Sequence, residues 1–285
     1  INGSNDAPVV SVNADAGDSA AESVTEADSG LSTHGTLTFS DVDASNAVTA
    51  TVTGVTLAGT TGNLTEADVA DMLTFVDLGV VDRTADHAQL RWDFNSQSER
   101  FDFLAAGESL TLTYAIKATD SSSAADAHQT VTITIHGTND AVSALSIGDK
   151  SYDERTDTLD LVKSIGVTFT DLDFAALDTD GLHPHALAIT NAVVVTGTTD
   201  RPTAFGKQEL IDLISDTGTI SKPAGQTGGT ATLKFTAAST VFDYLAANEH
   251  ITIRYTATVT DTAGVSTPKT FDVTINGSND APVVS

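Results

Sequence analysis

Short stretches in which apolar and polar residues alternate run along the whole chain, which is the pattern of strands with one buried face. In the first half they cover residues 36–39, 47–57, 90–94, 101–104, 110–118 and 131–135. Thr, Ser, Gly and Asp fill the intervals, where turns are expected. The pattern therefore predicts a protein built from short strands and tight turns.

The period of the apolar residues changes once in each half. In the first half, four apolar residues are spaced like one face of a helix: Val69, Met72, Leu73 and Val76. Thr65 and Asp68 precede this face and resemble a capping box, with Asp in place of the usual Glu. Leu210 and Leu213 begin the matching pattern in the second half. We expect one short helix in each half.

The sequence is internally repeated. Residues 1–11 and 275–285 are identical, and residues 135–143 are a near copy. A repeat of this length predicts two domains, 1–140 and 141–285, with residues 279–285 beginning the linker of a further repeat.

The second copy follows the first element by element but is longer. Asp171-Leu172-Asp173 matches Asp41-Val42-Asp43, and Leu233 and Phe235 match Leu90 and Trp92. The additional residues fall between the second Asp-x-Asp and the second helix and include 177–185, which we interpret as a surface loop.

The order of elements favours an all-β fold. About seven short strands per copy, with frequent turn signals, predict two tandem Greek-key β-sandwiches of cadherin or immunoglobulin type. Each contains one short helix between strands. A parallel α/β fold is excluded, because one helix per copy cannot provide the crossovers.

Charge narrows the possible partners. The chain has 39 acidic and 13 basic residues, a net charge of −26, and no cysteine. Such an excess disfavours binding to nucleic acid or to an anionic membrane surface. No apolar run approaches the ~20 residues that span a bilayer, so membrane insertion is not expected. Disulfides are excluded.

Acidic and amide residues recur in both copies at the ends of strands and in the linkers. They are Asn5, Asp6, Asp41, Asp43 and Asp120 in the first copy, and Asn139, Asp140, Asp171, Asp173 and Asp261 around the second, with Glu26 and Glu154 as looser counterparts. The linker and the loops after alternate strands gather at one end of a sandwich, so these side chains can converge.

Converging carboxylates need a cation. Two unit charges 4 Å apart repel by about 4 kcal/mol at an effective dielectric of 20. Ca²⁺ accepts six to eight oxygen ligands in irregular geometry, whereas Zn²⁺ prefers His or Cys. The alternative is that Asp and Asn form Asx-turns at strand ends. Recurrence in both copies favours Ca²⁺.

Each copy resembles a VCBS-type repeat, a cadherin-like domain that occurs in tandem in giant RTX adhesins exported by type I systems. The resemblance rests on residues 37–43 (LTFSDVD), 101–114 (FDFLAAGESLTLTY) and 131–140 (VTITIHGTND). The second copy departs from the pattern, since Asn248 replaces Gly107 and Val142 stands where Pro8 stands in the first.

The resemblance implies Ca²⁺ at the junctions. At the central junction it implies the ligands Asn139, Asp140, Asp171, Asp173 and Asp261, and at the first end Asn5, Asp6, Asp41, Asp43 and Asp120, with Glu26 and Glu154 as weaker candidates. It also implies a secreted protein on the bacterial cell surface that acts in adhesion and biofilm formation.

We therefore expect non-enzymatic, Ca²⁺-stiffened extender repeats whose partners are neighbouring repeats of the same chain. Other domains of the parent protein could bind surface glycans or other cells. The alternative is a module that itself binds carbohydrate or protein through loops 174–185 or 216–229.

Other candidate residues are weaker. His183-Pro184-His185 beside Asp180 could bind a metal, but they lie in the inserted stretch of one copy, and a surface loop is the preferred interpretation. Trp92 alternates with apolar residues and is assigned to the core. No nucleophile elbow or phosphate-binding loop occurs, so no enzyme is predicted.

Overall fold

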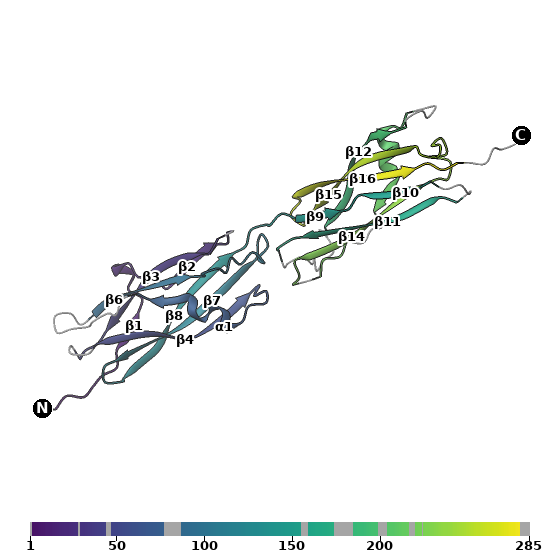
Figure 1. Cartoon of the computed structure of the whole chain (residues 1–285). Coiled ribbons are helices and arrows are strands. Elements are labelled where there is room, and N and C mark those ends of the chain that lie inside the picture. Colours follow the sequence, from purple (N-terminus) through teal and green to yellow (C-terminus); the bar gives the residue numbers. More distant parts are fainter. Residues whose placement is uncertain are drawn as a thin grey trace, which may run out of the picture. The chain divides into compact units, whose positions relative to one another are not determined.

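The structure is a computed structural model that describes residues 2–27, 29–43, 47–76, 87–154, 159–173, 185–198, 204–216, 220–223 and 225–279. The chain divides into two compact units, Ile1–Asn139 and Asp140–Ser285. We call them the first and the second unit and describe each by itself (Figure 1).

The first unit consists of two four-stranded sheets, with strand orders β1-β3-β6-β5 and β2-β8-β7-β4. Its strands are β1 (Val9–Ser11), β2 (Ala21–Thr25), β3 (Ser32–Ser40), β4 (Val48–Gly59), β5 (Leu73–Phe75), β6 (His87–Asn95), β7 (Ser109–Asp120) and β8 (Ala125–His136). Its short helices are η1 (Ala14–Ala16), α1 (Glu66–Val69) and η2 (Ala70–Met72). β2 runs parallel to β8, and the other pairs are antiparallel.

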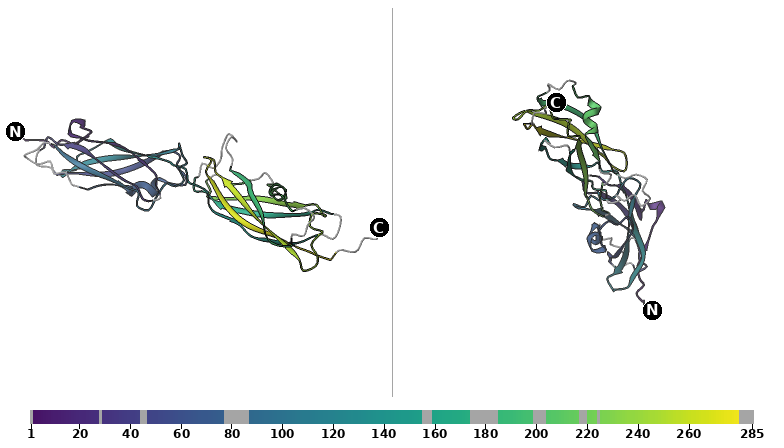
Figure 2. Two further views of the ribbon diagram at one scale, coloured as in Figure 1. Left: turned by 90° about the horizontal axis from the view of Figure 1, so that it is seen from above. Right: turned by 90° about the vertical axis from the view of Figure 1, so that its right-hand side faces the viewer.

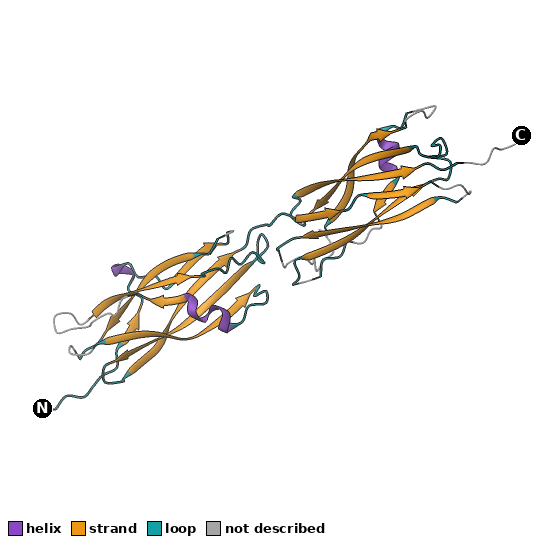
Figure 3. Cartoon of the chain, viewed as in Figure 1, coloured by secondary structure: helices purple, strands orange, loops and turns teal. Residues whose placement is uncertain are grey.

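The second unit repeats this plan, with strand orders β13-β14-β11-β9 and β10-β16-β15-β12. Its strands are β9 (Ser143–Ile147), β10 (Lys150–Asp153), β11 (Leu161–Thr170), β12 (Ala186–Gly197), β13 (Ile214–Asp216), β14 (Gly228–Ala237), β15 (His250–Thr260) and β16 (Ser266–Asn276). In the described part of this unit the helix is α2 (Lys207–Asp212). In each unit the strands form two layers and helices are short (Figures 2 and 3).

The core of each unit lies between the two sheets. Along β7 every second residue is buried, and Leu110, Leu112 and Tyr114 are completely inaccessible. The same holds for Ile253 and Tyr255 in β15. Because each fully buried apolar side chain contributes about 1.5–3 kcal/mol, these alternating strands supply the main driving force for folding. The all-β sandwich prediction is confirmed.

The short helix was predicted in the right place but with too great a length. Thr65 is its N-cap, and the carboxylate of Asp68 accepts the Thr65 N–H, which is one of the two bonds of a capping box; it also accepts the Thr65 hydroxyl. The helical turns end at Met72, and Leu73 begins β5, where it pairs with Phe94 of β6. Val76, predicted on the apolar face, is exposed. Pairing with a neighbouring strand overrides the helical spacing.

Residues 101–104 were wrongly predicted as a strand. They form a turn, with Phe101 at φ 64°. The alternation is nevertheless meaningful, because Phe101 and Leu104 are completely buried. The segment is a loop that inserts its apolar side chains into the core, and Phe242 and Leu245 do the same in the second unit.

Candidate cation sites of the two units

The two Asp-x-Asp motifs directly follow equivalent strands, β3 and β11. In each motif the backbone N–H of the second aspartate donates to the carboxylate of the first. The Asp43 N–H lies 2.8 Å from Asp41 Oδ1, and the Asp173 N–H lies 3.1 Å from Asp171 Oδ1. Asp41 and Asp171 are 3% and 2% exposed. The Asx-turn, which was the alternative to a cation site, is therefore present at both motifs, and it engages one oxygen of each buried carboxylate.

The aspartates at the ends of β7 and β15 organise the next turn. Asp120 Oδ1 accepts from the N–H groups of Ser122 and Ala124 at 2.9 and 2.8 Å. Asp261 Oδ1 accepts equivalent bonds from Ala263 and Val265. Both carboxylates are buried. These hydrogen bonds shape the turns that lead into β8 and β16.

In the first unit the linker residues lie against these acids. Asn5 Nδ2 donates to Asp120 Oδ2 at 2.7 Å, and the Asp6 N–H donates to Asp43 Oδ2 at 2.6 Å. Burial raises the pKa of Asp120, but the hydrogen bonds from Asn5 and from the turn hold that pKa below its usual value. The structure thus brings all five residues predicted for the first end into one hydrogen-bonded group, which we call the first acid cluster: Asn5, Asp6, Asp41, Asp43 and Asp120.

One buried carboxylate oxygen of Asp41 lacks a hydrogen bond. Within the described part of the chain, no donor reaches Asp41 Oδ2. A buried carboxylate oxygen without a donor or cation is costly, because its hydration is lost without replacement. Carboxylate and amide oxygens are the ligands that Ca²⁺ prefers, so the chemistry of the cluster fits this ion.

The side chains are not preassembled around an ion. Within the described part of the chain, no group of three or more His, Cys, Asp or Glu side chains is arranged to hold a metal. Asp43 and Asp120 are instead engaged with N–H groups of the linker and the turn. Several carboxylates could share an ion here only if some of these hydrogen bonds were exchanged for metal–oxygen contacts.

The second acid cluster, Asp140, Asp171, Asp173 and Asp261, shares part of this framework. The Asp140 N–H donates to Asp173 Oδ2 at 3.1 Å, as Asp6 does to Asp43. Asn139 is the last residue of the first unit. The two clusters therefore have equivalent positions within their own units.

The second cluster contains two basic side chains, His185 and Lys222, that no sequence pattern connects with it. His185 Nε2 lies 2.5 Å from Asp171 Oδ2, and both side chains are buried. Lys222 Nζ donates to the main-chain oxygen of Asp173 and lies 4.0 Å from Asp171 Oδ1. Burial lowers the pKa of Lys222, and the charges of Asp171 and Asp173 act in the opposite direction.

These contacts correct two expectations. His185 was expected in a surface loop, but it is buried and its ring lies 5.3 Å from that of Phe169. Lys222 belongs to the 216–229 stretch, which was considered as a recognition loop, but its side chain is 1% exposed. Asp180, His183 and Pro184 lie outside the described residues. The chain has 13 basic residues against 39 acidic ones. This scarcity is the sequence signal that could have identified Lys222 as a counterion.

Glu26 and Glu154 lie at the other end of each unit. Thr25 pairs with His136 at the end of β8, whereas Asp120 precedes the start of β8. Twelve residues of strand separate these ends, which is roughly 35 Å. Glu26 Oε1 accepts from the N–H and hydroxyl of Thr138, and Glu154 Oε1 does so from Ser278. Both glutamates therefore anchor the segment that leaves their unit.

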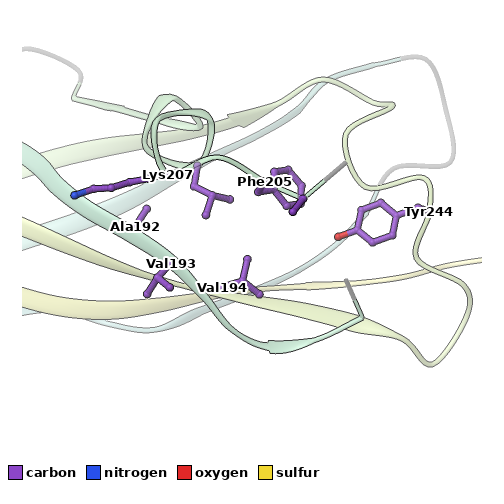
Figure 4. Close-up of a pocket in the computed structure, with 8 residues that line it drawn as sticks. Ala192, Val193, Val194, Phe205, Lys207 and Tyr244 are labelled. Carbon is purple, nitrogen blue, oxygen red and sulfur yellow. The ribbon is translucent and has the colours of Figure 1, made fainter. Parts of the chain in front are cut away.

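A cavity of about 300 Å³ opens between α2 and β12 of the second unit. It is lined by Val193, Val194, Phe205, Lys207, Leu210 and Tyr244, with two alanines. Phe205 and Tyr244 lie at one end and Lys207 at the other (Figure 4). The lining is mostly apolar, which is typical of small-molecule pockets.

Comparisons with known proteins return no matching family model and no matching curated protein. Extracellular cadherin domains 3–6 of protocadherin gamma B2 are similar in structure, with 14% identity, a TM-score of 0.41, and coverage of 95% of this chain and 49% of that one. A titin fragment, I67–I69 with Glu-to-Ala changes, has 7% identity, a TM-score of 0.34, and coverage of 94% and 65%.

The sialic acid binding region of a Streptococcus sanguinis SK1 adhesin has 10% identity, a TM-score of 0.27, and coverage of 96% of this chain and 78% of that one. At these TM-scores the similarities assign neither a function nor a partner to the chain. Among the described residues, no helix has the length and apolar character needed to cross a membrane.

Proposed function

We propose that the chain is a non-enzymatic, Ca²⁺-responsive spacer of an extracellular adhesion protein. The observation that carries the proposal is the buried, unpartnered Asp41 Oδ2 within a cluster that also holds the linker residues Asn5 and Asp6. The sequence resemblance to cadherin-like repeats of bacterial adhesins and the tandem β-sandwiches support the adhesive and extracellular context.

As a spacer, the chain would depend on Ca²⁺ because the first acid cluster holds the linker against the unit when a cation is bound and holds it less firmly without one. Asp41, Asp43 and Asp120 would hold Ca²⁺, with Asn5 and Asp6 supplying further oxygens. Bound Ca²⁺ would supply positive charge and flexible oxygen coordination. Asp43 and Asp120 already contact the linker, so closing the cluster restrains the linker against the unit. Without neutralisation, the carboxylates repel one another and weaken that restraint.

The test is thermal unfolding of the full chain in about 10 mM Ca²⁺ and in excess chelator. Extracellular modules bind Ca²⁺ at about 10⁻⁴–10⁻³ M, and one site at ten times its dissociation constant adds about 1.4 kcal/mol. For a unit of this size we expect Tm to rise by about 3–6 °C. Asp41→Asn should abolish the rise.

Asp71→Asn provides the control, because Asp71 is an exposed acid of η2, away from the cluster. It should keep the Ca²⁺-dependent rise of the wild type. Equal Tm in Ca²⁺ and chelator for the wild-type chain would refute the proposal, as would a rise that survives Asp41→Asn.

A second candidate function is direct binding of a small carbohydrate, favoured by the cavity beside Phe205 and Tyr244. Aromatic walls with one basic residue, Lys207, could accommodate a sugar ring. A glycan array with the wild-type chain and with Val193→Trp, which would fill the cavity, tests this function. A glycan that binds the wild-type chain but not the variant would support this function. If the wild-type chain binds no glycan on the array, the function is rejected.

A further inference from the structure

The two acid clusters share their carboxylates but differ in what faces them. In the described part of the first unit, no Lys, Arg or His side chain forms a hydrogen bond or ion pair with Asp41. In the second unit, the equivalent Asp171 faces Lys222 on Oδ1 and His185 on Oδ2. The oxygen that lacks a partner in the first unit is thus occupied in the second.

Lys222 is held in place by the fold. Its neighbour Ser221 forms a two-way backbone bridge with Thr230 of β14, with both N···O distances at 2.8 Å. Thr227, just before β14, accepts from the Asp171 N–H at 2.9 Å. The segment that bears the lysine is therefore attached to the strand beside the acids, and the ammonium is directed into the cluster.

His185 also has a defined counterpart. Val48 pairs with Asp120 at the start of β4, whereas Ala186 pairs with Thr260 at the start of β12. His185 directly precedes Ala186 and thus stands opposite Asp261, in the place that Val48 takes opposite Asp120. Val48 is a buried apolar residue with no proton to donate. The second unit has a hydrogen-bonding side chain where the first has a hydrocarbon.

We propose that Lys222, together with His185, is a built-in counterion of the second unit that takes the place of a divalent cation at Asp171. The first cluster, in which no described Lys, Arg or His side chain contacts Asp41, is the one that takes Ca²⁺. This inference rests on the proposed function for the first cluster and adds that the two repeats respond differently to Ca²⁺.

An ammonium can substitute for a metal ion here because it contacts the same kinds of oxygen. Lys222 reaches a main-chain carbonyl of Asp173 and approaches the carboxylate of Asp171, both of which are typical Ca²⁺ ligands. A second cation in the same space would be repelled by the first. Ca²⁺ and the buried ammonium are therefore mutually exclusive at this cluster.

The test is hydrogen exchange of the full chain, measured by mass spectrometry in about 10 mM Ca²⁺ and in chelator. The reporters are matched amides, Ser122 and Ala124 on Asp120 against Ala263 and Val265 on Asp261. At ten times the dissociation constant, Ca²⁺ should slow exchange of the first-unit reporters about tenfold. The second-unit reporters should change less than about twofold.

Lys222→Met then removes the ammonium and keeps a chain of similar length. We expect its second-unit reporters to exchange faster in chelator and to become Ca²⁺-sensitive, slowing about tenfold. Lys234→Met, which removes an exposed lysine of β14, should behave like the wild type. If Lys222→Met does not fold, the wild-type comparison still decides.

The outcomes separate the two claims. Equal slowing of both reporter sets in the wild type overturns the inference and leaves the proposed function standing. A Lys222→Met chain that folds but gains no Ca²⁺ response also overturns the inference. In a third outcome, Ca²⁺ does not slow exchange at the first-unit reporters, but Lys222→Met gains a Ca²⁺ response at the second-unit reporters. This result overturns the proposed function of the first cluster and supports the role of Lys222.

Discussion

At the scale of single residues, equivalent positions of the two units have the same identity but different surroundings. Asp41 and Asp171 both follow a core strand, and each accepts a hydrogen bond from the N–H of the aspartate two residues later. Their remaining oxygens differ, because His185 reaches Asp171 Oδ2, whereas no hydrogen-bond donor among the described residues reaches Asp41 Oδ2. The chemistry of each carboxylate is thus decided by residues distant in the sequence.

Tyr114 and Tyr255 are a second such pair. Both are buried, and burial raises the pKa of each hydroxyl above its ordinary value. The Tyr114 hydroxyl donates to the Val69 oxygen at 2.9 Å, whereas the buried Tyr255 hydroxyl has no hydrogen-bond partner among the described residues. We expect Tyr114→Phe to cost about 1 kcal/mol and Tyr255→Phe to be neutral or slightly stabilising.

Chemical denaturation of the two variants measures this difference. A larger loss of unfolding free energy for Tyr255→Phe than for Tyr114→Phe would show that the hydrogen-bond assignment is wrong.

Asp18 provides a pH-dependent prediction. Burial raises its pKa, but hydrogen bonds from Thr38, Asn13, Thr36 and Gln89 hold that pKa below the usual 3.8. A carboxylate with a depressed pKa in the folded state stabilises the fold above pH 3.8, and this contribution is lost as pH falls through the folded-state pKa. Asp18→Asn should cost about 1–2 kcal/mol at neutral pH.

The stability difference between wild type and Asp18→Asn should therefore be constant at pH 5–7 and shrink below about pH 4. Thermal unfolding across this range measures it, with Asp15→Asn, an exposed acid of η1, as the control. A difference that grows on acidification would contradict the assignment.

At the scale of elements, the loops that carry buried aromatic residues lie tightly against the last strand of each unit. A side chain at Gly137 would come within 2.3 Å of the Leu104 oxygen, and one at Gly277 within 2.4 Å of the Ala246 oxygen. Gly54, at a bulge of β4, has open space around it. These glycines therefore have different tolerance for a methyl group.

We expect Gly137→Ala to destabilise the first unit by about 1–3 kcal/mol through overpacking. Gly54→Ala should change the unfolding free energy by no more than about 0.5 kcal/mol. Urea denaturation of both variants tests this, and equal effects would mean that the loop does not press on Gly137 as described.

The elements also show what the sequence could predict. Alternation located the long strands, such as β7, and the capping box located α1, because both signals are local. The end of the helix at Met72 and the turn at Phe101 depended on pairing with β6 and on core packing, which no local pattern contains. The acids of each cluster were found through their repetition, whereas Lys222 occurs in one copy and had no repeat to identify it.

At the scale of the whole molecule, the chain has a net charge of −26 and two units of the same fold, each with its own acid cluster. Charge of this size disfavours any compact state in which carboxylates gather, unless cations are present. The cation that we propose to neutralise the carboxylates differs between the units: it is Ca²⁺ in the first unit and the ammonium group of Lys222 in the second. A tandem protein could in this way combine Ca²⁺-dependent and Ca²⁺-independent repeats.

Equilibrium dialysis of Ca²⁺ against the full, chelator-treated chain tests the central claim most directly. We predict saturable binding in the range of about 10⁻⁴–10⁻³ M, abolished by Asp41→Asn and unchanged by Asp171→Asn. Failure of the wild-type chain to bind Ca²⁺ in this range, or binding that persists in Asp41→Asn, would contradict it.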